Sequence, residues 1–164
     1  MVCQQIQKTA GLLIALVLLV GSLLYIPDWY AVGVFKDCPL WSRLGYSLFH
    51  ASFLHALLNV WCFLSILFLY NIKVWHILAA YAIAVAVPSF VLSSTPTVGF
   101  SAVDYALLGI VATMVGRKVY YNLCIGIYIL VGFLFPFVAG WLHLYSYVAG
   151  LVVGLLTMPI PCRR

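Results

Sequence analysis

Six apolar stretches run along the chain, separated by charged residues, proline and asparagine. A helix needs roughly 20 apolar residues to cross a bilayer, so each stretch predicts one transmembrane helix. The expected fold class is therefore an all-α membrane protein, with residues 1–164 forming a single domain. The predicted helices cover residues 9–26, 46–70, 74–92, 99–116, 119–139 and 141–160.

Two segments of the chain need a separate interpretation. The first apolar stretch has one Lys before it, as a signal peptide does, but it is too long and lacks a clear cleavage site before Pro27. We therefore interpret it as a retained first helix. Residues 28–45 form the only long connection, and their aromatic content predicts a structured loop that lies in the membrane interface.

The composition indicates lipid as the solvent. Hydrophobic residues make up 66% of the 164 residues and charged residues only 7%, with a mean hydropathy of +1.18. A soluble domain carries about a quarter charged residues, so a cytosolic Rossmann-type enzyme and a nucleic-acid-binding protein are excluded. The five cysteines are scattered singly, so neither a disulfide framework nor a metal site is expected.

The distribution of basic residues predicts the topology. If the N-terminus faces the cytoplasm, six basic residues lie on the inner side and two on the outer side, as the positive-inside rule requires. We expect a multi-pass integral membrane protein with both termini cytoplasmic, and its small size suits a bacterial plasma membrane. The inner residues are Lys8, Lys73, Arg117, Lys118, Arg163 and Arg164; the outer residues are Lys36 and Arg43, with Asp28 and Asp37.

Polar side chains inside three of the predicted helices are candidates for chemistry, because such residues are costly in a bilayer. The second, fourth and sixth helices all run from outside to inside. At 1.5 Å per residue, their polar groups lie about 21 to 30 Å above the inner face. A hydroxyl, an imidazole and an amide at one height are the parts that acyl transfer requires. These residues are His55 and Asn59, Ser101, and His143.

At these residues the chain resembles the rhomboid family of intramembrane serine proteases. The resemblance covers most of the chain and consists of three motifs in order within a six-helix chain. They are H-x-x-x-x-H-x-x-x-N (His50, His55, Asn59), G-x-S followed by an aromatic residue (Gly99, Ser101, Tyr105), and a stripe of His and small residues (His143, Ser146, Gly150, Gly154).

The resemblance implies a rhomboid-like bundle and a serine-type endopeptidase that cleaves transmembrane protein substrates within the bilayer. It implies a dyad of Ser101 and His143, and an oxyanion hole formed by Asn59, His55 and the backbone N–H of Ser101. Tyr105 would pack against the imidazole. No metal or organic cofactor is expected, and the oligomeric state, the substrate and the organism are left open.

The chain departs from the family pattern at two points. Ala102 stands where the family usually has Gly, in the turn that places an oxyanion donor. In the sixth helix, aligning the two glycines with the family motif would put Tyr147 at the position of the general base. We prefer the register one turn earlier, with His143 as the base. The other register predicts an inactive pseudoprotease that binds transmembrane helices.

Two further polar residues have open roles. We interpret His50 as structural, holding the loop against the top of its helix. Asp104 lies one turn below Ser101, where a carboxylate needs a partner such as His143, His55 or a tyrosine hydroxyl. We favour a structural hydrogen bond over a third catalytic role. A proton-conducting transporter ranks below both rhomboid readings, because the inner halves of the three helices are nearly all apolar.

Overall fold

The computed structural model describes residues 2–157, and within them the chain is all-helical, with three short 3-10 turns and one isolated β-bridge between Val34 and Thr97. The predicted all-α fold is confirmed. The seven helices of the described part are α1 (Val2–Gly21), α2 (Leu40–Gly45), α3 (Phe53–Leu69), α4 (Val74–Val85), α5 (Ser101–Ala112), α6 (Lys118–Gly132) and α7 (Gly140–Leu156).

Most of the predicted helices extend beyond the helices that the structure shows. Residue 46 was wrong as the start of the second predicted helix, because Ser52 caps α3 by accepting a hydrogen bond from the N–H of His55 at 3.1 Å. Residue 92 was wrong as the end of the third, because Pro88 disfavours helical geometry in the residue before it. The short helix α2 within the predicted loop was missed.

The remaining boundaries shift for similar local reasons. α1 ends at Gly21, since glycine is a typical residue at a helix C-terminus. Gly99 has a φ of +124°, so α5 begins only at Ser101. α6 ends at Gly132, before Pro136. The predicted end of the last helix, residue 160, and the inner residues Arg163 and Arg164 lie outside the described residues.

Helix length gives limited information about membrane spans. By length and hydropathy, no single helix within residues 2–157 qualifies as a span. The pair Leu40–Leu48 and Phe53–Leu69, which is bent by 84° at its break, qualifies when the two parts are taken together.

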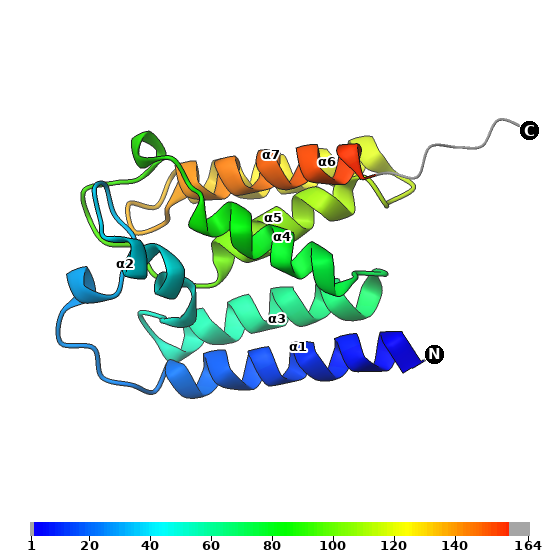
Figure 1. Ribbon diagram of the computed structural model, residues 1–164. Helices are drawn as coiled ribbons and strands as arrows, with labels where there is room; N and C mark the ends of the chain where they lie inside the picture. The colour runs from blue at the N-terminus through cyan, green and yellow to red at the C-terminus, as the bar shows by residue number, and fades with distance from the viewer. Residues whose placement is uncertain (1, 158–164) are drawn as a thin grey trace, which may run out of the picture.

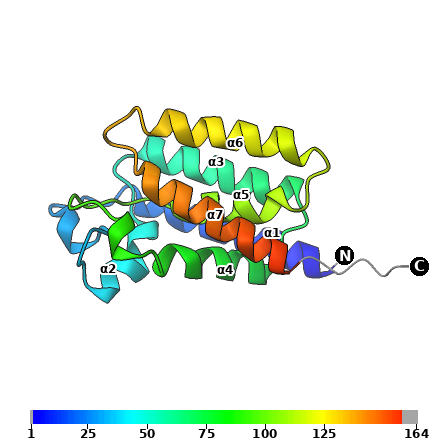
Figure 2. The same cartoon turned by 90° about the horizontal axis from the view of Figure 1, so that it is seen from above.

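The helices lie side by side in a bundle (Figures 1 and 2). α1 begins and α7 ends at one end of this bundle, and the connection that contains α2 lies at the other (Figure 1). α5 lies between α3 and α7 in both views, and nearly all of its residues are buried. α6 lies at the edge, and Ile129 is its only fully buried residue. The core of the bundle is therefore built around α5.

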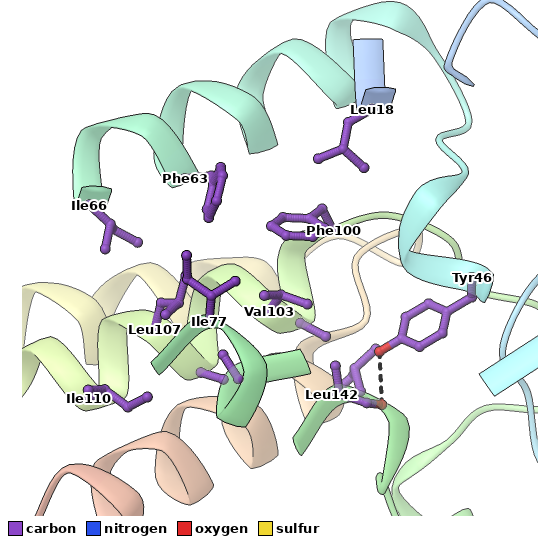
Figure 3. Packing of buried hydrophobic residues seen from close by; sticks show 14 of the residues in the cluster. Leu18, Tyr46, Phe63, Ile66, Ile77, Phe100, Val103, Leu107, Ile110 and Leu142 are labelled. Carbon is purple, nitrogen blue, oxygen red and sulfur yellow. Dashed lines mark hydrogen bonds between the residues drawn. The ribbon is translucent and has the colours of Figure 1, made fainter. Parts of the chain in front are cut away.

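Aromatic and aliphatic side chains fill the space between α3 and α5 (Figure 3). The rings of Phe63 and Phe100 meet edge to face, with their centroids 5.2 Å apart. Next to them, the buried Tyr46 donates a hydrogen bond to the carbonyl of Ala84 at 3.1 Å, which joins the 3-10 turn before α3 to the end of α4. These contacts hold the start of α5 against the helices on one side.

Glycines let α5 and α7 approach until their backbones touch. A Cβ atom added to Gly150 would overlap the carbonyl group of Ala106, and one added to Gly109 would lie 2.6 Å from the N atom of Leu151. One turn further along, a Cβ at Gly154 would lie 2.8 Å from the Cγ2 of Thr113. Small residues at such crossings are typical of tightly packed membrane helices.

Gly150→Ala should destabilise the fold, because the new methyl group meets a backbone carbonyl that cannot turn away. We expect a loss of about 1–3 kcal/mol from overpacking. Gly126→Ala is the matched control, since a Cβ there has nothing within 4 Å. Thermal unfolding in detergent measures both variants. Equal midpoints for the two would contradict the close approach.

Candidate active site

Ser101 and His143 meet at the end of the bundle where α5 and α7 begin. Ser101 is the first residue of α5, and His143 lies in the first turn of α7. The Oγ of Ser101 and the Nε2 of His143 are 2.9 Å apart, which is hydrogen-bonding distance. His143 is buried, whereas Ser101 keeps some exposure. This is the geometry of a nucleophile paired with a base.

Tyr105 holds the imidazole from one side. It lies one turn after Ser101 on α5, and its ring stacks on that of His143 with centroids 4.3 Å apart and planes 19° apart. A stacked ring limits rotation of the imidazole and keeps Nε2 directed at Ser101. The structure therefore brings together the three residues that the sequence assigned to the dyad and its support.

His55 and Asn59 lie on α3 and contact the backbone just before Ser101. A Cβ on Gly99 would lie 2.9 Å from the Nε2 of His55 and 3.3 Å from the Nδ2 of Asn59, so only glycine leaves room for them. The Nδ2 of Asn59 is buried and has no hydrogen-bond partner among the described residues. It is a donor held next to the nucleophile.

The N-terminus of α5 adds backbone donors to the same place. The N–H groups of the first turn of a helix have no carbonyl partner within the helix, and that of Ser101 is among them. The helix dipole also makes this end positive, so an anion is favoured there. Side-chain donors of α3 that lie beside Gly99 and the backbone N–H of Ser101, two residues further along the chain, are thus gathered at this end of α5.

His50 positions the backbone of this turn. Its Nε2 accepts a hydrogen bond from the N–H of Phe100 at 3.2 Å, and its ring meets that of His55 edge to face at 5.2 Å. The N–H of Gly99 donates to the carbonyl of Tyr46 at 3.1 Å. The prediction was that His50 holds the loop against the top of its helix; the contact found is with the backbone of Phe100, the residue before the nucleophile.

A two-stranded contact, which sequence reasoning missed, supports the segment before α5. The N–H of Val34 donates to the carbonyl of Thr97 and the N–H of Thr97 to that of Val34, both at 2.8 Å. The N–H of Lys36 donates to the carbonyl of Ser93, also at 2.8 Å. Neither segment shows a strand pattern in the sequence. Where the segments meet, a Cβ on Gly33 would lie 2.8 Å from the Cβ of Pro96, but no sequence pattern indicates this pairing.

Tyr147 does not face Ser101. It lies one turn after His143 on α7, and its hydroxyl donates to the Oδ1 of Asn122 on α6 at 2.7 Å, so the hydroxyl is turned toward α6 and not toward Ser101. The structure therefore has the register in which His143 occupies the position of the base. Ser146, Gly150 and Gly154 follow His143 on the face of α7 that lies toward α5.

The carboxyl group of Asp104 does not have the hydrogen-bond partner that was expected for it. The prediction of a structural hydrogen bond was wrong: the side chain is 2% exposed, and neither carboxyl oxygen has a hydrogen-bond partner among the described residues. His143 bonds Ser101 instead. The sequence shows that Asp104 lies one turn from Ser101, but it does not show that the side chain points away from α7.

Comparisons of the chain with models of protein families, with curated proteins and with solved structures found no match. Within residues 2–157, no three His, Cys, Asp or Glu side chains are grouped as metal ligands would be. The groups present at the site are the hydroxyl of Ser101, the imidazole of His143 and nearby hydrogen-bond donors such as the Nδ2 of Asn59.

Gly99→Ala should damage the site and the fold together. Alanine is strained at a φ of +124°, and its methyl group would collide with the His55 ring. We expect a loss of about 1–3 kcal/mol in unfolding free energy. Gly116→Ala is the control, because a Cβ there meets nothing within 4 Å. Equal stability of the two variants would contradict the described turn.

Proposed function

We propose that this protein is a rhomboid-like intramembrane serine endopeptidase that cleaves transmembrane substrates near the outer face of the membrane. The observation that carries the proposal is the 2.9 Å pairing of the Ser101 hydroxyl with the His143 imidazole, in a buried setting, at one end of an apolar helical bundle. The donors beside Ser101 supply the remaining part of an acyl-transfer site.

In the proposed reaction, the Oγ of Ser101 attacks the carbonyl carbon of the scissile peptide bond while His143 accepts its proton at Nε2. The Ser101 N–H and the side chains of Asn59 and His55 stabilise the oxyanion of the tetrahedral intermediate. His143 then protonates the leaving amine, and the peptide C–N bond breaks. A water molecule hydrolyses the acyl-enzyme with His143 as the base again. Tyr105 keeps the imidazole in place through both steps.

The surface of the bundle supports a membrane location. Large apolar side chains are exposed on α1, α3 and α6, including Leu13, Trp61 and Leu123, and water is a poor solvent for such a surface. We infer six spans, formed by α1, α3, α4, α5, α6 and α7 in a bacterial plasma membrane. In this arrangement α2 lies in the outer interface, where its exposed Leu40 and Trp41 contact lipid headgroups.

The charges fit this orientation. Lys73 precedes α4 and Arg117 precedes α6, and both helices begin at the end of the bundle where α1 begins (Figure 1). Asp28 and Asp37 lie in the connection at the other end, near the dyad. With the first end cytoplasmic, Lys73 and Arg117 are inside, Lys36 and Arg43 are the two basic residues outside, and the active site opens outward.

The substrate class follows from the buried position of the dyad. A peptide bond in a regular helix is shielded by its own hydrogen bonds and side chains. A transmembrane segment with weak helix propensity and small residues near the outer face can unwind and present its backbone to Ser101. The competing reading, a pseudoprotease that only binds helices, needs Tyr147 opposite Ser101, whereas Tyr147 bonds Asn122.

Cleavage of a transmembrane reporter by the purified protein in liposomes tests the proposal. We expect Ser101→Ala and His143→Ala to lower the rate by roughly 10⁴-fold or more. Tyr147→Phe, which removes a hydroxyl that bonds Asn122 of α6, should retain cleavage. A fluorophosphonate should label the unmodified protein but not Ser101→Ala. Failure of the unmodified protein both to cleave and to be labelled would favour the helix-binding pseudoprotease.

Asn59→Ala should lower kcat by about 10²–10³-fold with little change in KM, because an oxyanion donor acts mainly in the transition state. Asn122→Ala removes an amide of the same size from α6, outside the site, and serves as the control. Steady-state kinetics on the same reporter measures both variants. A change in KM alone would place Asn59 in substrate binding instead.

A further inference from the structure

Asp104 is the only buried carboxyl group in the described part of the chain. The sequence contains three acidic residues, and the other two, Asp28 and Asp37, are exposed. Asp104 is 2% exposed, and both of its carboxyl oxygens are buried without a partner among the described residues. The mechanism proposed above does not use it. Burial of a carboxyl group without a hydrogen-bond partner destabilises the fold, so a role for Asp104 is expected.

The side chain lies in the contact between α5 and α3. Gly109 and Thr113 of α5 face α7, and Asp104, five and nine residues before them, lies on the opposite side of the helix, which is the side toward α3. On the same side, Phe63 of α3 packs against Phe100, which precedes α5. Asn59 lies one turn before Cys62 and Phe63, so it shares their face of α3. Asp104 and Asn59 therefore border the same space, and Asn59 is the residue nearer to the Ser101 end.

Asn59 and Asp104 carry complementary hydrogen-bonding groups that have no partner among the described residues. The Nδ2 of Asn59 is a buried donor, and the carboxyl group of Asp104 supplies acceptor oxygens. A buried ionised carboxylate without a cation is strongly unfavourable, so the neutral acid, which also has one O–H donor, is the form that fits this site. The two groups do not bond each other directly. Buried waters typically join such groups with two to four hydrogen bonds.

We propose that Asp104, as a neutral carboxylic acid, binds a buried water molecule between α3 and α5, and that this water also accepts a hydrogen bond from the Nδ2 of Asn59. The amide would then be fixed with its remaining N–H directed at the oxyanion position beside Ser101. Asp104 is thus a positioning residue for the oxyanion hole. This role rests on the proposed protease function, whereas the water site itself does not.

Infrared spectroscopy and crystallography test the water site without using activity. The difference spectrum between the unmodified protein and Asp104→Asn assigns a C=O stretch of a protonated carboxyl group to Asp104. We expect this band in the unmodified protein and its loss in Asp104→Asn. A crystal structure should show one water within hydrogen-bonding distance of Asp104 and Asn59, absent from Asp104→Leu. Lack of the band or of the water would overturn the proposal.

Kinetics on the reporter tests the positioning role. Asp104→Leu keeps the volume but removes the water ligands, and we expect kcat to fall roughly 10- to 100-fold with KM unchanged, less than for loss of the donor itself. Asp104→Asn can still bind the water and should stay within about threefold of the unmodified rate. Cys62→Ala changes packing at the same contact and should retain kcat.

The outcomes separate the two proposals. Full activity of Asp104→Leu, or an equal loss in Cys62→Ala, would overturn the positioning role even if Ser101 is an active nucleophile. If the unmodified protein neither cleaves nor is labelled, the protease proposal fails, and the carboxyl band and the bound water still decide whether Asp104 forms the site described.

Discussion

α5 and α7 touch backbone to backbone, and the pairing of Ser101 with His143 depends on that contact. Gly109 and Gly150 leave no space for a side chain between the two helices. The helices run in the same direction, so their first turns lie together at one end (Figure 1). At this separation, the short side chain of Ser101 reaches the ring of His143. A wider crossing would separate the pair, because a serine hydroxyl extends only one bond beyond Cβ.

The spacing along each helix turns this contact into a site. Tyr105 follows Ser101 by four residues, so it lies on the same side of α5 and covers the imidazole. Ser146 and Gly150 continue below His143 as a narrow face of small residues. The stacking and the dyad therefore need no long-range arrangement beyond one helix–helix register. That register also turns Tyr147 toward α6.

Much of this site could be predicted from the sequence because an apolar chain makes its polar residues conspicuous. Ser101, His143 and Asn59 were identified as polar groups at one height on three helices of the same direction, and Gly99 by its motif. The structure brings these residues together. Helix ends were less predictable, since they depend on single hydrogen bonds such as the Ser52 cap. A hydropathy pattern does not contain that information.

Asp104 and the loop contacts could not be predicted for a different reason. Spacing places Asp104 one turn from Ser101, but whether its side chain meets His143 or turns to α3 depends on the rotation of α5 within the bundle. That rotation is set by the glycine contact with α7 and by Phe63 and Phe100 on the other side. The pairing of residues 33–36 with 93–97 joins segments about sixty residues apart, and it has no local pattern.

The non-helical backbone before Ser101 explains why so much of the chain surrounds it. In a bilayer, exposed peptide groups have no water to bond, so irregular backbone is stable only where protein satisfies it. Here Val34 pairs with Thr97, Tyr46 accepts from Gly99, and His50 accepts from Phe100.

These partners serve the residues that lead up to the nucleophile. The series stops at Ser101, where the first N–H of α5 has no carbonyl partner within its helix. In the proposed mechanism the substrate's oxyanion is the partner of that N–H. In the proposed membrane location, the loop that satisfies its own irregular backbone thus leaves one donor for the reaction, and that donor gains its partner only when the transition state forms.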